Sequence, residues 1–183
     1  RCERNTVMPQ ISSFRGLRFN PARVGDLALA MCPPYDVISS ADQERLIHGS
    51  PYNIVRVESG QSLGGDTAEH NRYTRAAELL HSWIAEDALS LEDRPALYWL
   101  EHTFLWAGQC HTRRGVFAAV RLHPWSDRAV LPHETTFSGP KEDRYQLLDA
   151  TKVNVSPVFM LHRFQGEALN QAVSQRSEEH TSE

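Results

Sequence analysis

Helical periodicity is strongest in the middle of the chain, between residues 66 and 89. Apolar residues recur there every three or four positions, so they would line one side of a helix. They are Tyr73, Ala76, Ala77, Leu80, Trp83 and Ile84. The charged residues that would face water on the other side are Glu69, Arg72, Arg75 and Glu78. The pattern predicts a helix over residues 66–89 that is capped by Asp66 or Thr67 and packs its apolar side against the core.

Alternation of apolar and polar residues, which is typical of strands, is clearest on both sides of Ala107-Gly108-Gln109. Residues 96–106 and 111–125 are therefore predicted to form a β-hairpin around that turn. One face of its first arm would carry Tyr98, Leu100, His102, Phe104 and Trp106. Both His102 and His111 are interpreted as residues of the hairpin surface.

Shorter elements complete the predicted order. Strands are expected at residues 11–20, 50–59 and 156–164. Helices are expected at residues 40–49, with Ser40 and Gln43 as a capping box, at residues 140–149, and from residue 166 onward. This mixture predicts an α/β (α+β) fold, a single domain with a mixed, largely antiparallel sheet flanked by helices.

Composition limits the class of protein. The chain has 183 residues, of which 40% are hydrophobic and 23% charged, as in an ordinary globular domain. A net charge of -4 argues against nucleic acid as a partner. Cys2, Cys32 and Cys110 have no CxxC spacing, so neither a disulfide framework nor a zinc cage is indicated. No apolar run has the length of a membrane span, and we expect a cytoplasmic protein with no membrane partner.

Both ends of the chain are expected to carry foreign sequence. Residues 176–183, RSEEHTSE, resemble the translation of a sequencing adapter. The alternative is a natural solvated tail. Met8 is a candidate start residue. We therefore expect residues 8–175 to form the N-terminal part of a domain that is truncated at its C-terminus, followed by an adapter-derived tail at 176–183.

His133 and Glu134 open the first of three polar motifs, PHETT. A zinc-protease helix would need a second histidine one turn later, but that position is Phe137. The remaining functional interpretation is a catalytic general acid/base pair, because imidazole titrates near neutrality and a half-buried carboxylate can be tuned upward. The alternative is a loop in which both side chains bind backbone groups.

The second motif, SGPKEDR, lies at the predicted start of the helix at residues 140–149. Ser138 could cap this helix, and the amides after Gly139 could attract an anion. Lys141 and Arg144 are three residues apart, so both could bind phosphate oxygens. No GxxxxGK[ST] phosphate loop is present. The alternative is a surface helix with solvated charges.

The third motif, CPPYDVIS, places Tyr35 and Asp36 after two prolines, on a stiff loop that cannot be helical at that point. Tyr35 is a candidate substrate contact, and Asp36 is a candidate catalytic or metal-binding carboxylate. The alternative is a structural turn. Arg18, with its neighbour Arg15, could add a cationic wall, although isolated arginines on a strand are also simply solvated.

These motifs together resemble a known bacterial family. The segments ISSFRGLRFNP, CPPYDVIS, SPYNIVRVE, RRGVFAAVRL and VLPHETTFSGPKEDRYQLLDATKVNVSPVF, in this order, are similar to domain of unknown function 1015. One departure is Cys32, where the family more often has alanine. Members of the family continue into an Asp-Gly-His-His-Arg motif, which this chain lacks and which is similar to one in the ParB and sulfiredoxin-like superfamily.

The resemblance and the polar motifs lead to two hypotheses. Because the superfamily includes a free-serine kinase, the first is phosphoryl transfer from ATP or ADP with Mg²⁺ to a small hydroxylated metabolite. Similarity of fold is only an analogy for function. The second is a nucleotide-responsive binding module of the ParB type without turnover. Whether the protein is an enzyme, which substrate it takes and its oligomeric state stay open at this point.

Overall fold

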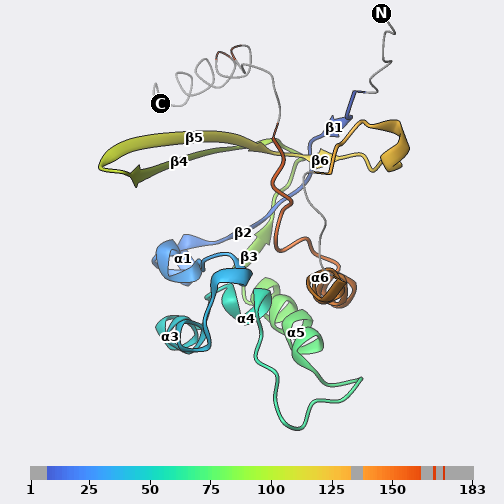
Figure 1. The fold of residues 1–183 in the computed structure, drawn as a ribbon. Helices are drawn as coiled ribbons and strands as arrows, with labels where there is room; N and C mark the ends of the chain where they lie inside the picture. The colour runs from blue at the N-terminus through green and yellow to red at the C-terminus, as the bar shows by residue number, and fades with distance from the viewer. Residues whose placement is uncertain (1–7, 133–137, 162–166, 168–170, 172–183) are drawn as a thin grey trace, which may run out of the picture.

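The computed structural model describes residues 8–132 and 138–161, together with residues 167 and 171. It combines helices with antiparallel strand pairs, which confirms the α/β class (Figure 1). The strands are β1 Ile11–Ser12, β2 Leu17–Phe19, β3 Leu89–Leu91, β4 Tyr98–Trp106, β5 Gln109–Phe117 and β6 Ala119–Val120. The helices are α1 Pro21–Val24, α2 Leu27–Ala30, α3 Ser40–Gly49, α4 Val55–Glu58, α5 Arg72–Ala85 and α6 Ser138–Thr151, with 3-10 turns η1 Tyr35–Val37 and η2 Trp125–Asp127.

The described strands form three separate two-stranded sheets, not one continuous sheet. β1 pairs with β6, β2 with β3, and β4 with β5, and every pairing is antiparallel. The strand predicted at residues 11–20 is divided between β1 and β2, because the chain crosses from one strand pair to another. Long-range pairing thus joins the N-terminal segment to two distant parts of the chain.

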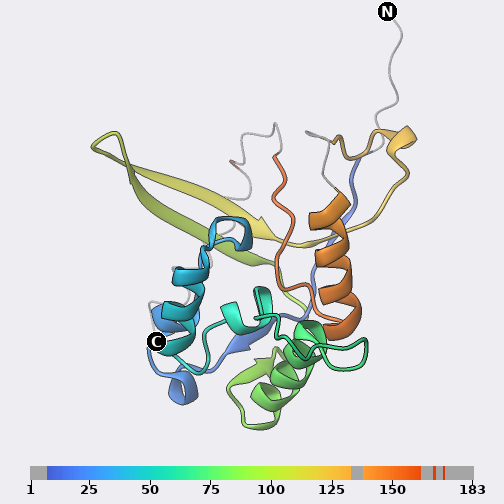
Figure 2. The same cartoon turned by 60° about the horizontal axis from the view of Figure 1, so that its bottom comes forward.

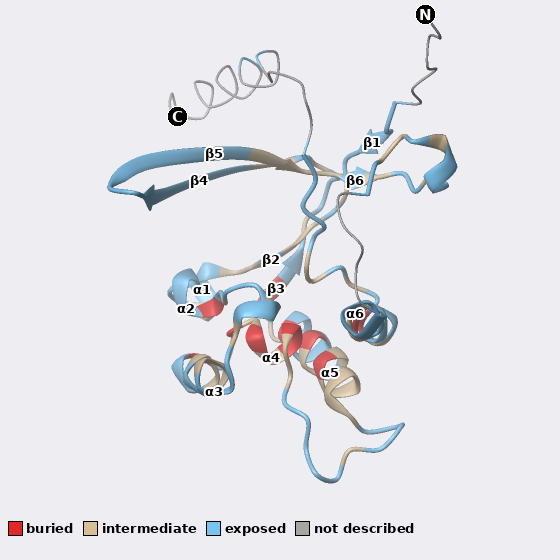
Figure 3. Ribbon diagram, viewed as in Figure 1, coloured by how far each residue is buried: buried red, intermediate tan, exposed pale blue. Residues whose placement is uncertain are grey.

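The predicted hairpin is confirmed as β4 and β5. Its turn has two residues, Ala107 and Gly108, with φ angles of 50° and 78°. Positive φ at both positions defines a hairpin turn whose twist matches that of the strands. His102 and His111 are exposed, as expected. In Figure 1 the hairpin projects away from the helices, and Figure 3 shows that the part near its tip is exposed.

The buried residues gather on α4 and α5 and next to the β2–β3 pair (Figure 3), and Trp83 of α5 belongs to this core cluster. The Trp83 side chain is 2% exposed. Its ring lies 5.8 Å from that of Phe19 and 6.0 Å from that of Tyr52, measured between centroids. The other buried members of this cluster are Val57, Ala76, Leu80, Ala88, Leu89 and Leu147. Of the apolar side predicted for the long helix, Ala76, Leu80 and Trp83 are buried. Tyr73 and Ala77 are half-buried, and Ile84 is exposed.

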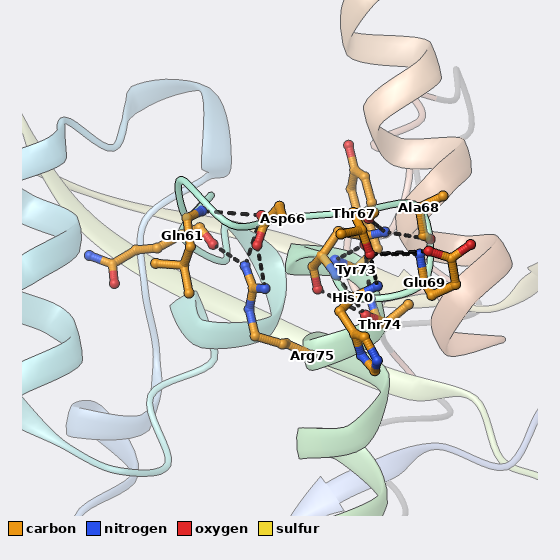
Figure 4. Close-up of polar contacts among 11 residues, drawn as sticks. Gln61, Asp66, Thr67, Ala68, Glu69, His70, Tyr73, Thr74 and Arg75 are labelled. Atoms are coloured by element: carbon orange, nitrogen blue, oxygen red, sulfur yellow. Dashed lines mark hydrogen bonds and ion pairs between the residues drawn. The ribbon is translucent and has the colours of Figure 1, made fainter.

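The long helix is shorter at both ends than its periodicity indicated. It begins at Arg72, because Asn71 and Thr74 form a capping box in which each side chain binds the other's backbone amide. The predicted caps Asp66 and Thr67 instead hold the preceding loop together (Figure 4). At the other end Asp87 has a φ of 60°, which no helix accommodates, and β3 follows.

The prediction of a strand at residues 50–59 is wrong. Residues 55–58 form α4, a single helical turn in which Val55, Val57 and Glu58 are all buried. The side chain of Asn53 starts this turn by accepting a hydrogen bond from the amide of Val55 at 3.0 Å. Ile54, Val55 and Val57 are therefore apolar because they pack around a short helix, and not because they lie on a strand.

The remaining predictions have mixed outcomes. The helix at residues 40–49 is confirmed as α3, although Ser39, not Ser40, is its N-cap. The helix at 140–149 is confirmed as the central part of α6. Residues 156–161 have no strand structure, which contradicts the strand predicted to begin there. The rest of that strand and most of the helix predicted from residue 166 lie outside the described residues.

Replacing Trp83 with alanine should lower the free energy of unfolding by about 3–5 kcal/mol, because it leaves a large cavity between Phe19 and Tyr52. Urea denaturation followed by circular dichroism would measure this change. The matched control is Trp106→Ala at the hairpin tip, where the side chain is 71% exposed. We expect a change of about 0.5 kcal/mol or less for the control. Equal effects of the two substitutions would contradict a core centred on Trp83.

Candidate functional site

The loop that carries Tyr35 and Asp36 is held against the start of α4 by the buried side-chain amide of Asn53. The side chain of Asn53 donates hydrogen bonds to the carbonyls of Leu29 and Met31, each at 2.8 Å. Pro33 and Pro34 then keep the backbone extended until η1 begins. As a result Tyr35 is half-buried, and Asp36 is exposed at the surface.

The second contributor to the site is the first half of α6. The helix as a whole packs against α5 (Figure 2). Leu147 anchors this helix in the core. Ser138 is itself helical, so it does not occupy the capping position that we predicted for it. Gly139 and Lys141 are exposed in the first turn. Amides of a first helical turn have no acceptor within the helix, and this end therefore favours an anion.

Arg144 connects these two segments. Its guanidinium carbon lies 4.1 Å from the centroid of the Tyr35 ring, in a cation–π contact. Two motifs that are separated by more than a hundred positions in the sequence thus meet through predicted site residues. Asp36 follows Tyr35 directly, and Lys141 lies one helical turn before Arg144.

The Arg144 guanidinium is also bound by carboxylate and carbonyl groups. It donates to the Glu58 carboxylate at 3.0 Å and to the Glu58 carbonyl at 2.9 Å. A further bond goes from its Nε to Asp143 at 3.0 Å. The planar guanidinium suits such a set of acceptors. Arg144 is therefore part of an internal ion-pair network and not a solvated charge of the helix surface.

Asp143 extends the network to α5. It accepts hydrogen bonds from Arg72 and, at 2.8 Å, from the Tyr73 hydroxyl. Burial alone would raise the pKa of Asp143, but hydrogen bonds from Arg144 and Tyr73 and the charges of Arg144 and Arg72 outweigh it and hold that pKa below 3.8. Burial, with the nearby Asp143, raises the pKa of the Tyr73 hydroxyl even though Arg72 opposes this. Arg72, which we expected to face water, is half-buried here.

Glu58 is the most buried charged group of the network, with 7% of its surface exposed. Its Oε1 accepts hydrogen bonds from Arg144 and from the Ser156 hydroxyl. Its Oε2 is buried and has no partner among the described residues. Burial, and after it the negative charge of Glu58, raises the pKa of the Cys32 thiol to about 11. With this pKa the Cys32 thiol stays protonated at neutral pH.

Arg15 and Arg18 lie outside this cluster, and His133 and Glu134 are not among the residues that the structure describes. Arg18 is exposed on β2 and pairs with Glu92 at 2.8 Å, while the Nε of Arg15 donates to the Glu92 carbonyl. His133 and Glu134 lie outside the described residues. The contribution of Arg18 to a cationic wall thus stays a prediction, as does the acid/base pair.

The sequence interpretation did not find Glu58, Asp143, Arg72 and Ser156 as members of the network. Glu58 was hidden because a strand at residues 50–59 would have turned its side chain toward water. The signal that could have found it is a carboxylate directly after Val57, in a short segment whose two valines are apolar. A charge in such a place requires an opposite charge from elsewhere in the fold.

A metal site is not evident in the part of the chain that is described. No group of three or more histidine, cysteine, aspartate or glutamate side chains there could hold an ion. Among the same residues, no helix has both the length and the apolar character needed to cross a bilayer.

The chain belongs to the family described as "Protein of unknown function (DUF1015)", whose model matches residues 11–183. The resemblance found in the sequence motifs is therefore confirmed. No curated protein and no solved structure shows a significant match to the chain.

The lowered pKa of Asp143 predicts how the network depends on pH. The ionised Asp143 carboxylate stabilises the folded state fully when the pH is well above 3.8, the ordinary pKa of an aspartate. This stabilisation is lost as the pH falls through the lower pKa that Asp143 has in the folded state. Asp143→Asn should therefore lower the free energy of unfolding by about 1–3 kcal/mol at pH 7. Below about pH 4 the difference from the parent should shrink, because the parent carboxylate becomes neutral as well.

Urea titrations at several pH values would measure this difference. The matched control is Asp149→Asn on the same helix, because Asp149 pairs with Lys152 at the exposed surface. Exposed ion pairs contribute little, so this variant should stay near the parent throughout. A difference for Asp143→Asn that is small at pH 7, or unchanged in acid, would contradict the network described above.

Proposed function

We propose that η1 and the first turns of α6 form one side of a site for phosphoryl transfer from a nucleotide to a small hydroxylated molecule, as in a serine kinase. The observation that supports this most is the contact of Arg144 with the Tyr35 ring at 4.1 Å. It holds a loop with an exposed carboxylate, Asp36, beside a helix start with an exposed cation, Lys141. Phosphoryl transfer depends on positioning and on charge stabilisation, which such a pair would supply.

Each residue has a defined role in the proposal. Lys141 and the first amides of α6, at Ser138 and Gly139, would bind phosphate oxygens. Asp36 would bind Mg²⁺ or orient the acceptor hydroxyl. Arg144 already has carboxylate partners, and it would act mainly by fixing Tyr35 in place.

The cofactors in this proposal are ATP or ADP with Mg²⁺. Magnesium bound with a nucleotide needs only one or two protein carboxylates, because phosphates and water supply its other ligands. Asp36 is the described candidate for such a carboxylate. His133 and Glu134 would provide proton transfer, although their positions are not described and the binding part of the proposal does not depend on them.

A nucleotide-responsive binding module of the ParB type, without turnover, is the second candidate. One observation favours it: Glu58 and Asp143 already neutralise Arg144. Fewer cations would then stabilise a transferring phosphoryl group, for which kinases and related enzymes use several. Incubation with ATP, Mg²⁺ and serine separates the two candidates, because only the enzyme forms ADP at a rate that depends on the acceptor.

Lys141→Ala should weaken the binding of ADP with Mg²⁺ by about tenfold or more, because it removes a charge-assisted bond to phosphate. Isothermal titration calorimetry with the 183-residue chain would measure this. The matched control is Lys152→Ala, which removes the same charge just beyond the other end of α6 and should bind ADP like the parent. Equal affinities for the parent and both variants would show that Lys141 is a solvated residue and that the proposed site is wrong.

A further inference from the structure

The loop between α4 and α5 borders a polar pocket that lies apart from Lys141. The pocket has a volume of about 360 Å³ and is lined by residues 59–63, with Gln43 of α3 and Arg72 of α5. Cavities of this size accept small metabolites. Arg72 is the charged residue of its lining.

Hydrogen bonds hold the wall of this pocket in place. Arg75 binds both carboxylate oxygens of Asp66, at 2.6 and 3.1 Å, and donates to the Gln61 carbonyl at 2.7 Å (Figure 4). The Asp66 carboxylate also accepts from the Leu63 amide at 3.1 Å. On the other side the Gln43 side chain donates to the Ser59 carbonyl. The carbonyls of Ser59 and Gln61 and the carboxylate of Asp66 are therefore used inside the wall.

Several other donors of the same wall have no such partner. The amides of Gly60, Gln61 and Ser62 donate to no described residue. Arg72 binds Tyr73 and Asp143 through Nη2 alone, so its Nε and Nη1 have no acceptor in the described part of the chain. Three successive unbonded amides can bind an oxyanion ligand, and the free side of a guanidinium suits a phosphate or a carboxylate.

Nearby carboxylates do not cancel this preference. Asp66 is paired with Arg75, Asp143 with Arg72 and Arg144, and Glu58 with Arg144. Each negative charge next to the pocket thus has a positive partner. An anion entering the pocket would meet hydrogen-bond donors and no uncompensated ionised group of like sign.

We propose that this pocket binds a small phosphate monoester, with Arg72 and the amides of residues 60–62 as its ligands. The inference does not rest on the nucleotide site at α6. The two places share only a contact, because Arg72 and Arg144 bind the same carboxylate of Asp143.

Glycerol 3-phosphate is a suitable probe for the 183-residue chain labelled with ¹⁵N. Titration should shift the amide signals of Gly60, Gln61 and Ser62 in a saturable way. Ser62→Asp places a negative charge at this exposed position and should weaken binding by about tenfold or more. The matched control, Ser126→Asp, adds the same charge on η2 and should bind like the parent.

Inorganic phosphate and lactate distinguish the phosphate group from a carboxylate. We expect phosphate to bind and lactate to bind more weakly. Stronger binding of lactate would overturn the assignment to a phosphate monoester. Unchanged affinity of Ser62→Asp, or loss of binding in Lys141→Ala instead, would place the anion at α6 and overturn the pocket assignment. Circular dichroism spectra like that of the parent would establish that each variant is folded.

Discussion

The ion pair of Arg144 with Glu58 is the interaction on which the arrangement of the helices most depends. A carboxylate as buried as Glu58 is tolerated only if an opposite charge reaches it. Arg144 meets that need from α6, and its guanidinium also contacts Tyr35 and Asp143. One side chain therefore ties α4, η1 and α6 together, and through Asp143 the network continues to α5.

This constraint separates the roles of the charged residues on α6. Arg144 and Asp143 point into the ion-pair network, while Lys141 remains at the surface. The network determines where the exposed groups Asp36 and Lys141 lie relative to each other, since it fixes the segments that carry them. The buried polar network thus decides which charged groups of these segments are exposed at the surface.

The polar loop after α4 depends on the same helices. Arg72 and Arg75 are both on the first turn of α5, where Arg72 binds Asp143 and Arg75 binds Asp66. Arg72 binds α6 through Asp143, and Arg75 holds the wall of the 360 Å³ pocket through the Gln61 carbonyl. An error in the start of α5 would displace both, which explains why the Asn71 cap matters for more than helix stability.

The sequence by itself determined the α/β class, the hairpin, the long amphipathic helix and the family. These features depend on local periodicity and on turn chemistry, such as Ala107-Gly108, which neighbouring residues impose on one another. Only the tertiary structure decided that residues 55–58 form a helical turn, that Glu58 is buried, and that Arg144 reaches both Glu58 and Tyr35. The physical reason is that burial of a charge is a property of the surrounding fold, and its compensating partner is contributed by a segment distant in sequence, so no local pattern encodes the pair.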